Sequence, residues 1–133
     1  MLTTQAASSS KLRFRVGHVV GGLAVLFLIF DGGIKALQLA PAIEATTQLG
    51  YAAQLVLPLG LLELACLALY VFPRTAVLGA ILLTGYLGGA IATQVRSGAP
   101  LFSLIFPIMI GALIWGGLFL RDARLRELLP LRK

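Results

Sequence analysis

The sequence predicts an all-α integral membrane protein, a four-helix bundle with both termini in the cytoplasm. The first observation is composition: 59% of the residues are hydrophobic and only 12% are charged, too little polar surface to cover a soluble fold. The second is a series of four long apolar runs, separated by turns that contain proline or glycine. The third is that the basic residues gather just outside those runs. The 133 residues allow one domain.

The chain begins with a small, polar, serine-rich segment, 1–10, which predicts a disordered tail ahead of a bundle at 11–121. The first span is predicted at about 16–39, because the charge-free stretch alone is short for a bilayer and Pro41 is the next helix stop. A basic flank before an apolar run also fits a signal peptide. However, no clear cleavage site follows, and three more apolar runs would hold the chain in the membrane.

The segment 42–51 predicts a short helix at the membrane interface, with Glu44 near its start and Gly50 at its end. The second span is predicted at 52–72. Pro58 is expected to kink it, because proline removes a backbone donor and crowds the preceding turn.

The third span, 75–96, is predicted to be the central helix of the bundle. Its small residues recur at helical spacing, and small residues let two helices approach backbone to backbone. One stripe holds Ala76, Ala80, Thr84 and Gly88, and the neighbouring stripe holds Gly85, Gly89 and Ala92.

A short turn at 98–100 leads into the fourth predicted span, 101–120, with Pro107 and Gly111 as expected bend points. The remaining segment, 122–133, is a basic amphipathic tail, which we expect to lie on anionic lipid at the cytoplasmic surface.

The placement of lysine and arginine predicts the orientation. Four spans put both termini on one side, which then holds nine of the 11 basic residues and leaves two on the other. The nine are Lys11, Arg13, Arg15, Arg74, Arg121, Arg124, Arg126, Arg132 and Lys133; the two are Lys35 and Arg96. The net charge of +6 therefore faces lipid head groups, so we expect the bilayer as partner and no nucleic acid.

Ionisable residues inside spans are functional hypotheses by default, because they are costly in a bilayer. Asp31 and Lys35 are four residues apart, so they share a helix face and can pair. Glu63 falls near mid-depth, where a carboxyl group must be protonated or paired. Together with Gln94 and Arg96, they occupy overlapping depths in the outer half. They form either a pocket that opens outward or a structural polar clamp.

The sequence offers no self-sufficient catalytic set, and we assign no catalytic residue, metal or cofactor. One histidine and one cysteine do not form a familiar zinc or haem site, and no phosphate-binding glycine loop follows a strand. Cys66 lies in an apolar run, so we expect an unreactive thiol that packs against its neighbours. We expect His18 to lie at the membrane interface. Packing and interface roles are also expected of Tyr70, Tyr86 and Trp115.

Three motifs occur in order: GLLEL at 60–64, LYVFPRTAVLGAILLTGYLGGAIATQVR at 69–96, and WGGLFLRDARLRELLP at 115–130. With them, the chain after Val16 resembles the DoxX-like family of small bacterial membrane proteins. The resemblance implies a four-helix bundle in the bacterial inner membrane. It also places Lys35, Glu63 and Arg96 at recurring polar positions of the family.

Relatives in the wider group are associated with thiosulphate:quinone oxidoreduction and with redox stress complexes. The resemblance therefore implies an accessory or partner subunit of a quinone- or thiol-linked membrane redox system, beside a membrane or soluble oxidoreductase. Many close members of the family carry histidines at two positions where this sequence has Gln94 and Ser103. The alternative is a small-molecule or lipid binding or transport module, which would oligomerise in order to transport. A third hypothesis, an enzyme acting alone on a quinone or sulphur compound, lacks a catalytic set.

The orientation can be tested with single cysteines. Ser97→Cys is expected to react with a membrane-impermeant thiol reagent in intact cells, because the side with two basic residues faces outward. Ser9→Cys is expected to react only after the cells are opened. Labelling in the reverse order would overturn the orientation.

Overall fold

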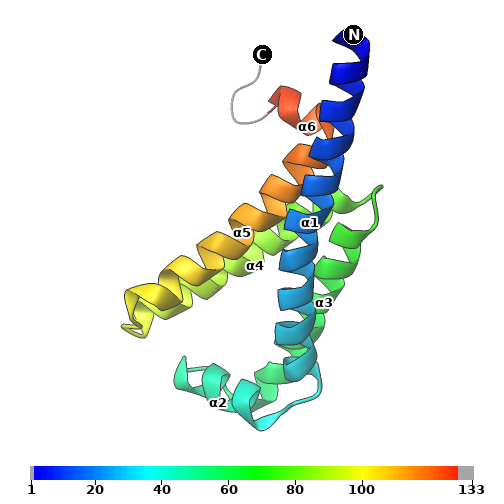
Figure 1. Cartoon of the computed structure of the whole chain (residues 1–133). Coiled ribbons are helices and arrows are strands. Elements are labelled where there is room, and N and C mark those ends of the chain that lie inside the picture. The colour runs from blue at the N-terminus through cyan, green and yellow to red at the C-terminus, as the bar shows by residue number, and fades with distance from the viewer. Residues whose placement is uncertain (1, 129–133) are drawn as a thin grey trace.

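The computed structural model describes residues 2–128, with side chains from residue 11 onward, and every regular element in this part is helical. Four helices are long and apolar enough to cross a membrane, which confirms the predicted four-helix membrane architecture (Figure 1). The elements are α1 (Leu2–Ala36), α2 (Ala40–Gln48), the 3-10 turn η1 (Ala53–Leu55), α3 (Val56–Val71), α4 (Ala76–Arg96), α5 (Leu101–Arg121) and α6 (Ala123–Leu128).

The first helix differs from the expectation at both ends. The backbone of residues 2–10 continues α1 where we expected a disordered tail, because each residue added to an existing helix gains a hydrogen bond. At the other end α1 stops at Ala36, short of 39. Gln38 adopts a left-handed φ of 55°, a conformation that closes helices. Pro41 lies in the first turn of α2, where a missing N–H is tolerated.

Pro58 does not act as the predicted kink. It is the third residue of α3, and the first backbone N–H groups of a helix have no partner within it. A proline there removes nothing that the helix uses. The preceding chain enters through η1 instead.

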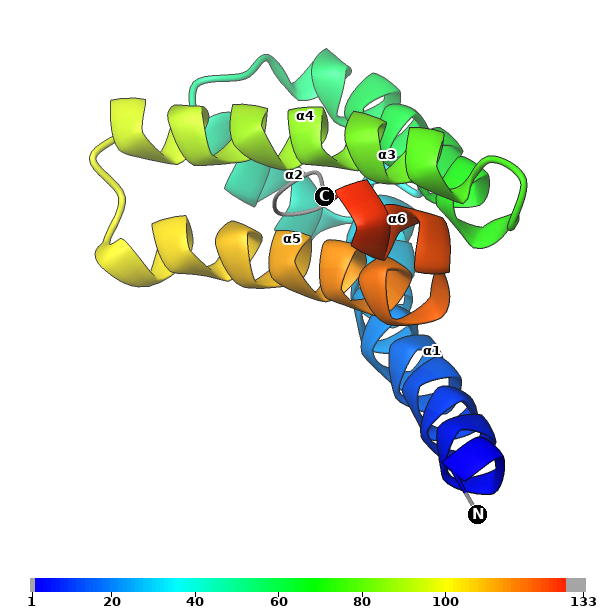
Figure 2. The same cartoon turned by 90° about the horizontal axis from the view of Figure 1, so that it is seen from above.

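The four spans form a ring in which α1 and α4 each contact both α3 and α5. Among the described residues, the backbones of α1 and α4 do not come into close contact, so no span is central and the prediction that 75–96 is a central helix is wrong. Figures 1 and 2 show α4 running beside α5, while α2 lies across one end of the bundle. The start of α1 and the short helix α6 lie at the opposite end of the bundle from α2 (Figure 1).

At the end of the bundle nearer the termini, glycines bring helices into direct backbone contact. A Cβ added to Gly117 of α5 would lie 2.6 Å from the backbone nitrogen of Gly21 of α1. A Cβ added to Gly79 of α4 would come still closer to the backbone of Tyr70 in α3. Small residues permit such crossings. A similar contact holds α3 against α1 at the other end of the bundle, where a Cβ added to Gly60 would lie 2.7 Å from the backbone nitrogen of Ala36.

The second half of α4 behaves differently from the prediction. A Cβ added to Gly85, Gly88 or Gly89 would meet no atom within 4 Å. The stripe of small residues there mediates no close helix contact within the chain. In Figure 1, α4 and α5 lean away from α1 and α3 on the way to the turn that joins them, and these glycines belong to the part of α4 (Ala76–Arg96) that leads to this turn.

The basic segment after α5 is partly folded back onto the bundle. The Arg126 guanidinium donates hydrogen bonds to the backbone oxygens of Phe119 (2.7 Å) and Leu120 (3.0 Å), which are left over at the end of α5. Arg121 donates to the hydroxyl of buried Tyr70 at 3.1 Å. The predicted lipid contact of the tail stays a prediction, and residues 129–133 lie outside the described part.

The α1–α5 crossing generates a prediction with a neighbouring control. Gly117→Ala is expected to lower the free energy of unfolding by about 1–3 kcal/mol, because the new methyl group collides with the backbone of Gly21. Gly116→Ala is expected to raise it by up to about 1 kcal/mol, since its Cβ would come no closer than 3.9 Å to Val20 and alanine favours the helix. Unfolding in mild detergent measures both. Equal effects would show that the crossing is not tight.

Candidate functional site

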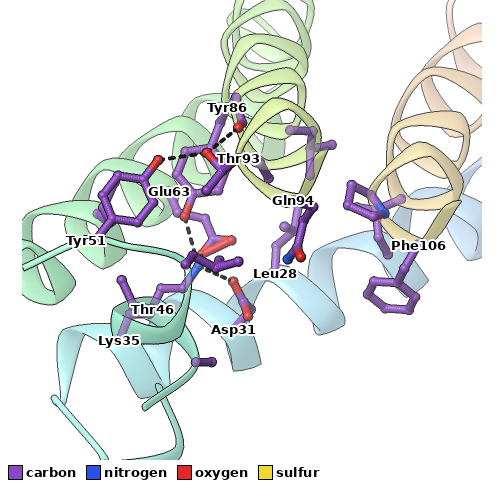
Figure 3. A pocket seen from close by; sticks show the side chains of 18 of the residues that line it. Leu28, Asp31, Lys35, Thr46, Tyr51, Glu63, Tyr86, Thr93, Gln94 and Phe106 are labelled. Carbon is purple, nitrogen blue, oxygen red and sulfur yellow. Dashed lines mark hydrogen bonds and ion pairs between the residues drawn. The ribbon is translucent and has the colours of Figure 1, made fainter. Parts of the chain in front are cut away.

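A cavity of about 380 Å³ lies between α1, α3, α4 and α5, at the end of the bundle that α2 covers (Figure 3). One part of its wall is polar and carries ionisable side chains from three helices. The other part is apolar and includes Phe27, Leu28, Leu59, Leu87, Phe106 and Ile110. A wall of this kind can take up a molecule that has one polar and one apolar end.

Lys35 is the centre of the polar wall. Its Nζ lies 2.7 Å from Oδ2 of Asp31, 2.9 Å from the hydroxyl of Tyr86 and 3.7 Å from Oε2 of Glu63. The pair with Asp31 forms at the spacing that predicted it, and the other two contacts link α1 to α4 and to α3. We call Asp31, Lys35, Glu63 and Tyr86 the Lys35 cluster.

Glu63 is the most deeply buried member of the Lys35 cluster. Its residue is 1% exposed, whereas the side chain of Asp31 is 29% exposed. Among the described residues, Oε2 of Glu63 is the one buried side-chain oxygen or nitrogen that has no hydrogen-bond partner. A buried carboxyl oxygen without a donor is costly, so the position favours a positively charged or hydrogen-bond-donating neighbour.

The mouth of the cavity near α2 is held by a second polar contact. The hydroxyls of Tyr51 and Thr93 share a hydrogen bond of 2.9 Å, which ties the chain after α2 to α4. Thr93 also donates to the backbone oxygen of Gly89 at 2.8 Å. Tyr51, Thr93 and Gly89 all line the cavity.

Four of the five residues that the sequence placed in a pocket line this cavity: Asp31, Lys35, Glu63 and Gln94. Arg96 does not. It is exposed, and its Nη2 donates to the backbone oxygen of Leu49 at 3.2 Å, beyond the end of α2. The last turn of α4 points Arg96 toward α2 rather than toward the carboxyl groups of Asp31 and Glu63. Arg96 therefore holds α2 over the cavity and does not neutralise either acid.

Sequence reasoning missed four polar lining residues, namely Thr46, Tyr51, Tyr86 and Thr93. Tyr86 was expected to be a packing group, yet it accepts a hydrogen bond from Lys35. A pattern was available for α4: Tyr86, Thr93 and Gln94 fall at positions i, i+7 and i+8, on one helix face.

The remaining candidates lie away from the cavity. His18 is exposed and packs against the ring of Phe14, and Cys66 is buried in the core. Trp115 of α5 donates to the hydroxyl of Thr84 in α4 at 2.6 Å. Within residues 11–128, no three His, Cys, Asp or Glu side chains gather closely enough to hold a metal ion.

Comparison with protein families gives one match. The model of a family described as the DoxX-like family matches residues 19–117, which is well over half of the chain. This range contains every residue that lines the cavity. Neither the curated proteins nor the solved structures contain a match.

The contact between Lys35 and Glu63 can be measured as a coupling energy. Lys35→Met is expected to cost about 3–5 kcal/mol of stability, because it leaves two carboxyl groups without their cation. Glu63→Gln is expected to cost less, since the amide keeps hydrogen-bonding capacity. The double variant is expected to cost less than the sum, by about 0.5–3 kcal/mol.

Unfolding in detergent gives the four stabilities of this cycle. Lys11→Met removes an exposed lysine from the same helix and is the control, with an expected change within about 0.5 kcal/mol. Strictly additive losses would contradict an interaction between Lys35 and Glu63.

Proposed function

The chain belongs to the DoxX-like family, and from that premise we propose that this multi-pass membrane protein binds a small amphipathic molecule in the cavity between its spans. The cavity volume of about 380 Å³ falls within the range of small-molecule sites, roughly 300–1,000 Å³. The polar wall around Lys35 and the apolar wall around Phe106 supply complementary surfaces for the two ends of such a molecule.

The observation that carries this proposal is that two glycines of α4 form part of the cavity wall. Gly85 and Gly89 line it from α4, and a Cβ at either position would meet no protein atom within 4 Å. Glycine within a helix costs about 1 kcal/mol relative to alanine. At Gly85 and Gly89 no close helix contact offsets this loss of helix stability. Room for a ligand explains why glycine stands there.

We further propose that the protein lies in the bacterial inner membrane with α2 on the outer side. The placement of lysine and arginine supports this orientation. The cavity would then lie in the outer half of the bilayer, and its ligand would be one that reaches the membrane from outside or from the outer leaflet.

Filling the cavity is the direct test. Gly89→Leu is expected to abolish ligand binding, because Gly89 lines the cavity, a Cβ there meets no protein atom within 4 Å, and the leucine side chain takes up cavity volume. Gly88→Leu is the matched control: its position on α4 is equally free of neighbours, but it does not line the cavity. The probes are hexylamine, 1-hexanol and hexanoate, and the readout is the melting temperature in lipid nanodiscs.

At least one probe is expected to raise the melting temperature of the natural chain and of Gly88→Leu, and none that of Gly89→Leu. If no probe stabilises the natural chain, or if Gly89→Leu responds as the natural chain does, the cavity is not a binding site of this kind.

A second proposal follows from family membership. The chain would act as an accessory subunit of a quinone- or thiol-linked redox system and present its bound molecule to a membrane or soluble oxidoreductase. The association of the wider group with such systems supports this role, and a transport function would require several copies of the chain.

Affinity purification of the tagged protein from its native membrane tests the accessory role. An oxidoreductase is expected to co-purify, and deletion of the gene is expected to increase sensitivity to thiol and peroxide stress. Purification without an oxidoreductase, together with unchanged sensitivity, would contradict it. The binding proposal would survive that result.

A further inference from the structure

We propose that the polar end of the ligand is a protonated amine, so that the cavity selects small amphipathic amines over alcohols and carboxylic acids of the same size. This inference rests on the proposed binding function and adds the chemical class of the ligand. Two observations carry it: the ratio of acids to bases in the cavity wall, and an oxygen atom that the protein leaves without a partner.

The cavity wall contains more acid than base. Among the described residues, its carboxyl groups are those of Asp31 and Glu63, and its one basic side chain is Lys35. Arg96, which would have balanced the count, is turned toward Leu49 and does not line the cavity. With both carboxyl groups ionised and Lys35 protonated, the wall has a net charge of about −1, which one added positive charge would neutralise.

Lys35 is already committed to other partners. Two of its three N–H donors go to Asp31 and to the hydroxyl of Tyr86, at 2.7 and 2.9 Å. Its distance to Oε2 of Glu63 is 3.7 Å, which is an ion pair but too long for a hydrogen bond. Lys35 therefore orients the cluster but leaves a donor position open at Glu63.

Glu63 supplies the second observation. It is 1% exposed, it lines the cavity, and its Oε2 accepts no hydrogen bond from any described residue. An ammonium group would both donate to this oxygen and bring the missing charge. Hydrogen bonds between charged partners are about twice as strong as neutral ones, so an alcohol would gain less. A carboxylate would add a third negative charge and be repelled.

The remainder of the cavity specifies an apolar body for this amine. The rings of Phe27 and Phe106 pack edge to face, with centroids 4.7 Å apart, and both line the wall. Leu28, Leu87 and Ile110 continue the same surface. A short alkyl or aryl amine would place its charge at Glu63 and its body among these side chains.

The test compares hexylamine, 1-hexanol and hexanoate, which share one alkyl chain and differ in the head group. Affinities are measured on the full-length protein in nanodiscs, at neutral pH and low salt, where hexylamine is protonated. Hexylamine is expected to bind at least tenfold more tightly than 1-hexanol, and hexanoate more weakly than either. This comparison needs no variant, so it does not depend on any substitution folding correctly.

Two variants then locate the selectivity. Asp31→Asn and Glu63→Gln each remove one negative charge from the wall and are each expected to weaken hexylamine at least tenfold while changing 1-hexanol less than threefold. Glu44→Gln, an exposed α2 residue that does not line the cavity, is the control for a general loss of charge on this side and is expected to leave hexylamine unchanged.

The outcomes separate this inference from the proposed function. Tighter binding of 1-hexanol or hexanoate than of hexylamine, or equal loss in Glu44→Gln and Asp31→Asn, would overturn the amine selectivity while the cavity remained a binding site. Absence of binding by all three probes would overturn the binding function and the inference together.

Discussion

The constraint on which the rest of this structure depends is the carboxyl group of Glu63, buried at 1% exposure inside a membrane bundle. A lipid-exposed charge of this kind costs at least about 2.5–3.5 kcal/mol, so its compensation must come from within the protein. Lys35 supplies the positive charge, while Asp31 and Tyr86 hold Lys35 in position. The contacts of Lys35 therefore link α1, α3 and α4 at one level of the bundle.

The two ends of the bundle differ in how α4 and α5 pack on the other spans. Near the termini, Gly21 and Gly117 bring α1 and α5 into backbone contact, and Tyr70 and Arg121 fill the remaining polar positions. Near α2, Gly60 of α3 still packs against the backbone of α1, whereas Gly85 and Gly89 of α4 face open volume and Tyr86 reaches α1 through a hydrogen bond from Lys35. The divergence of α4 and α5 from α1 and α3 leaves a wedge-shaped space, and the cavity occupies its wide part (Figure 1).

Local patterns predicted much of this architecture. Hydropathy and turn residues located all four spans, because apolar length and helix stops depend on neighbours in the sequence. The spacing of Asp31 and Lys35 predicted their pairing for the same reason.

What was missed depends on tertiary contacts. Nothing local shows that Arg96 turns to a backbone oxygen of Leu49, or that Tyr86 reaches Lys35 from another helix. The glycines of α4 were read as a contact surface because sequence cannot distinguish a glycine that admits a helix from one that leaves space. The end of α1 was placed too late because Gln38, an ordinary residue, adopts the left-handed conformation that closes it.

The arginines at the terminal end of the bundle serve two processes that are separated in time. In the predicted orientation, Arg121 and Arg126 act during membrane insertion simply as positive charges that keep their side of the chain in the cytoplasm. In the finished fold, the same guanidinium groups bind the backbone oxygens of Gly117, Phe119 and Leu120 and complete the end of α5. Lysine could replace them in the first process, but a single ammonium lacks the fork of donors with which Arg121 reaches both Gly117 and Tyr70. Biogenesis constrains only the charge at these positions, whereas the folded protein constrains the shape of the side chain.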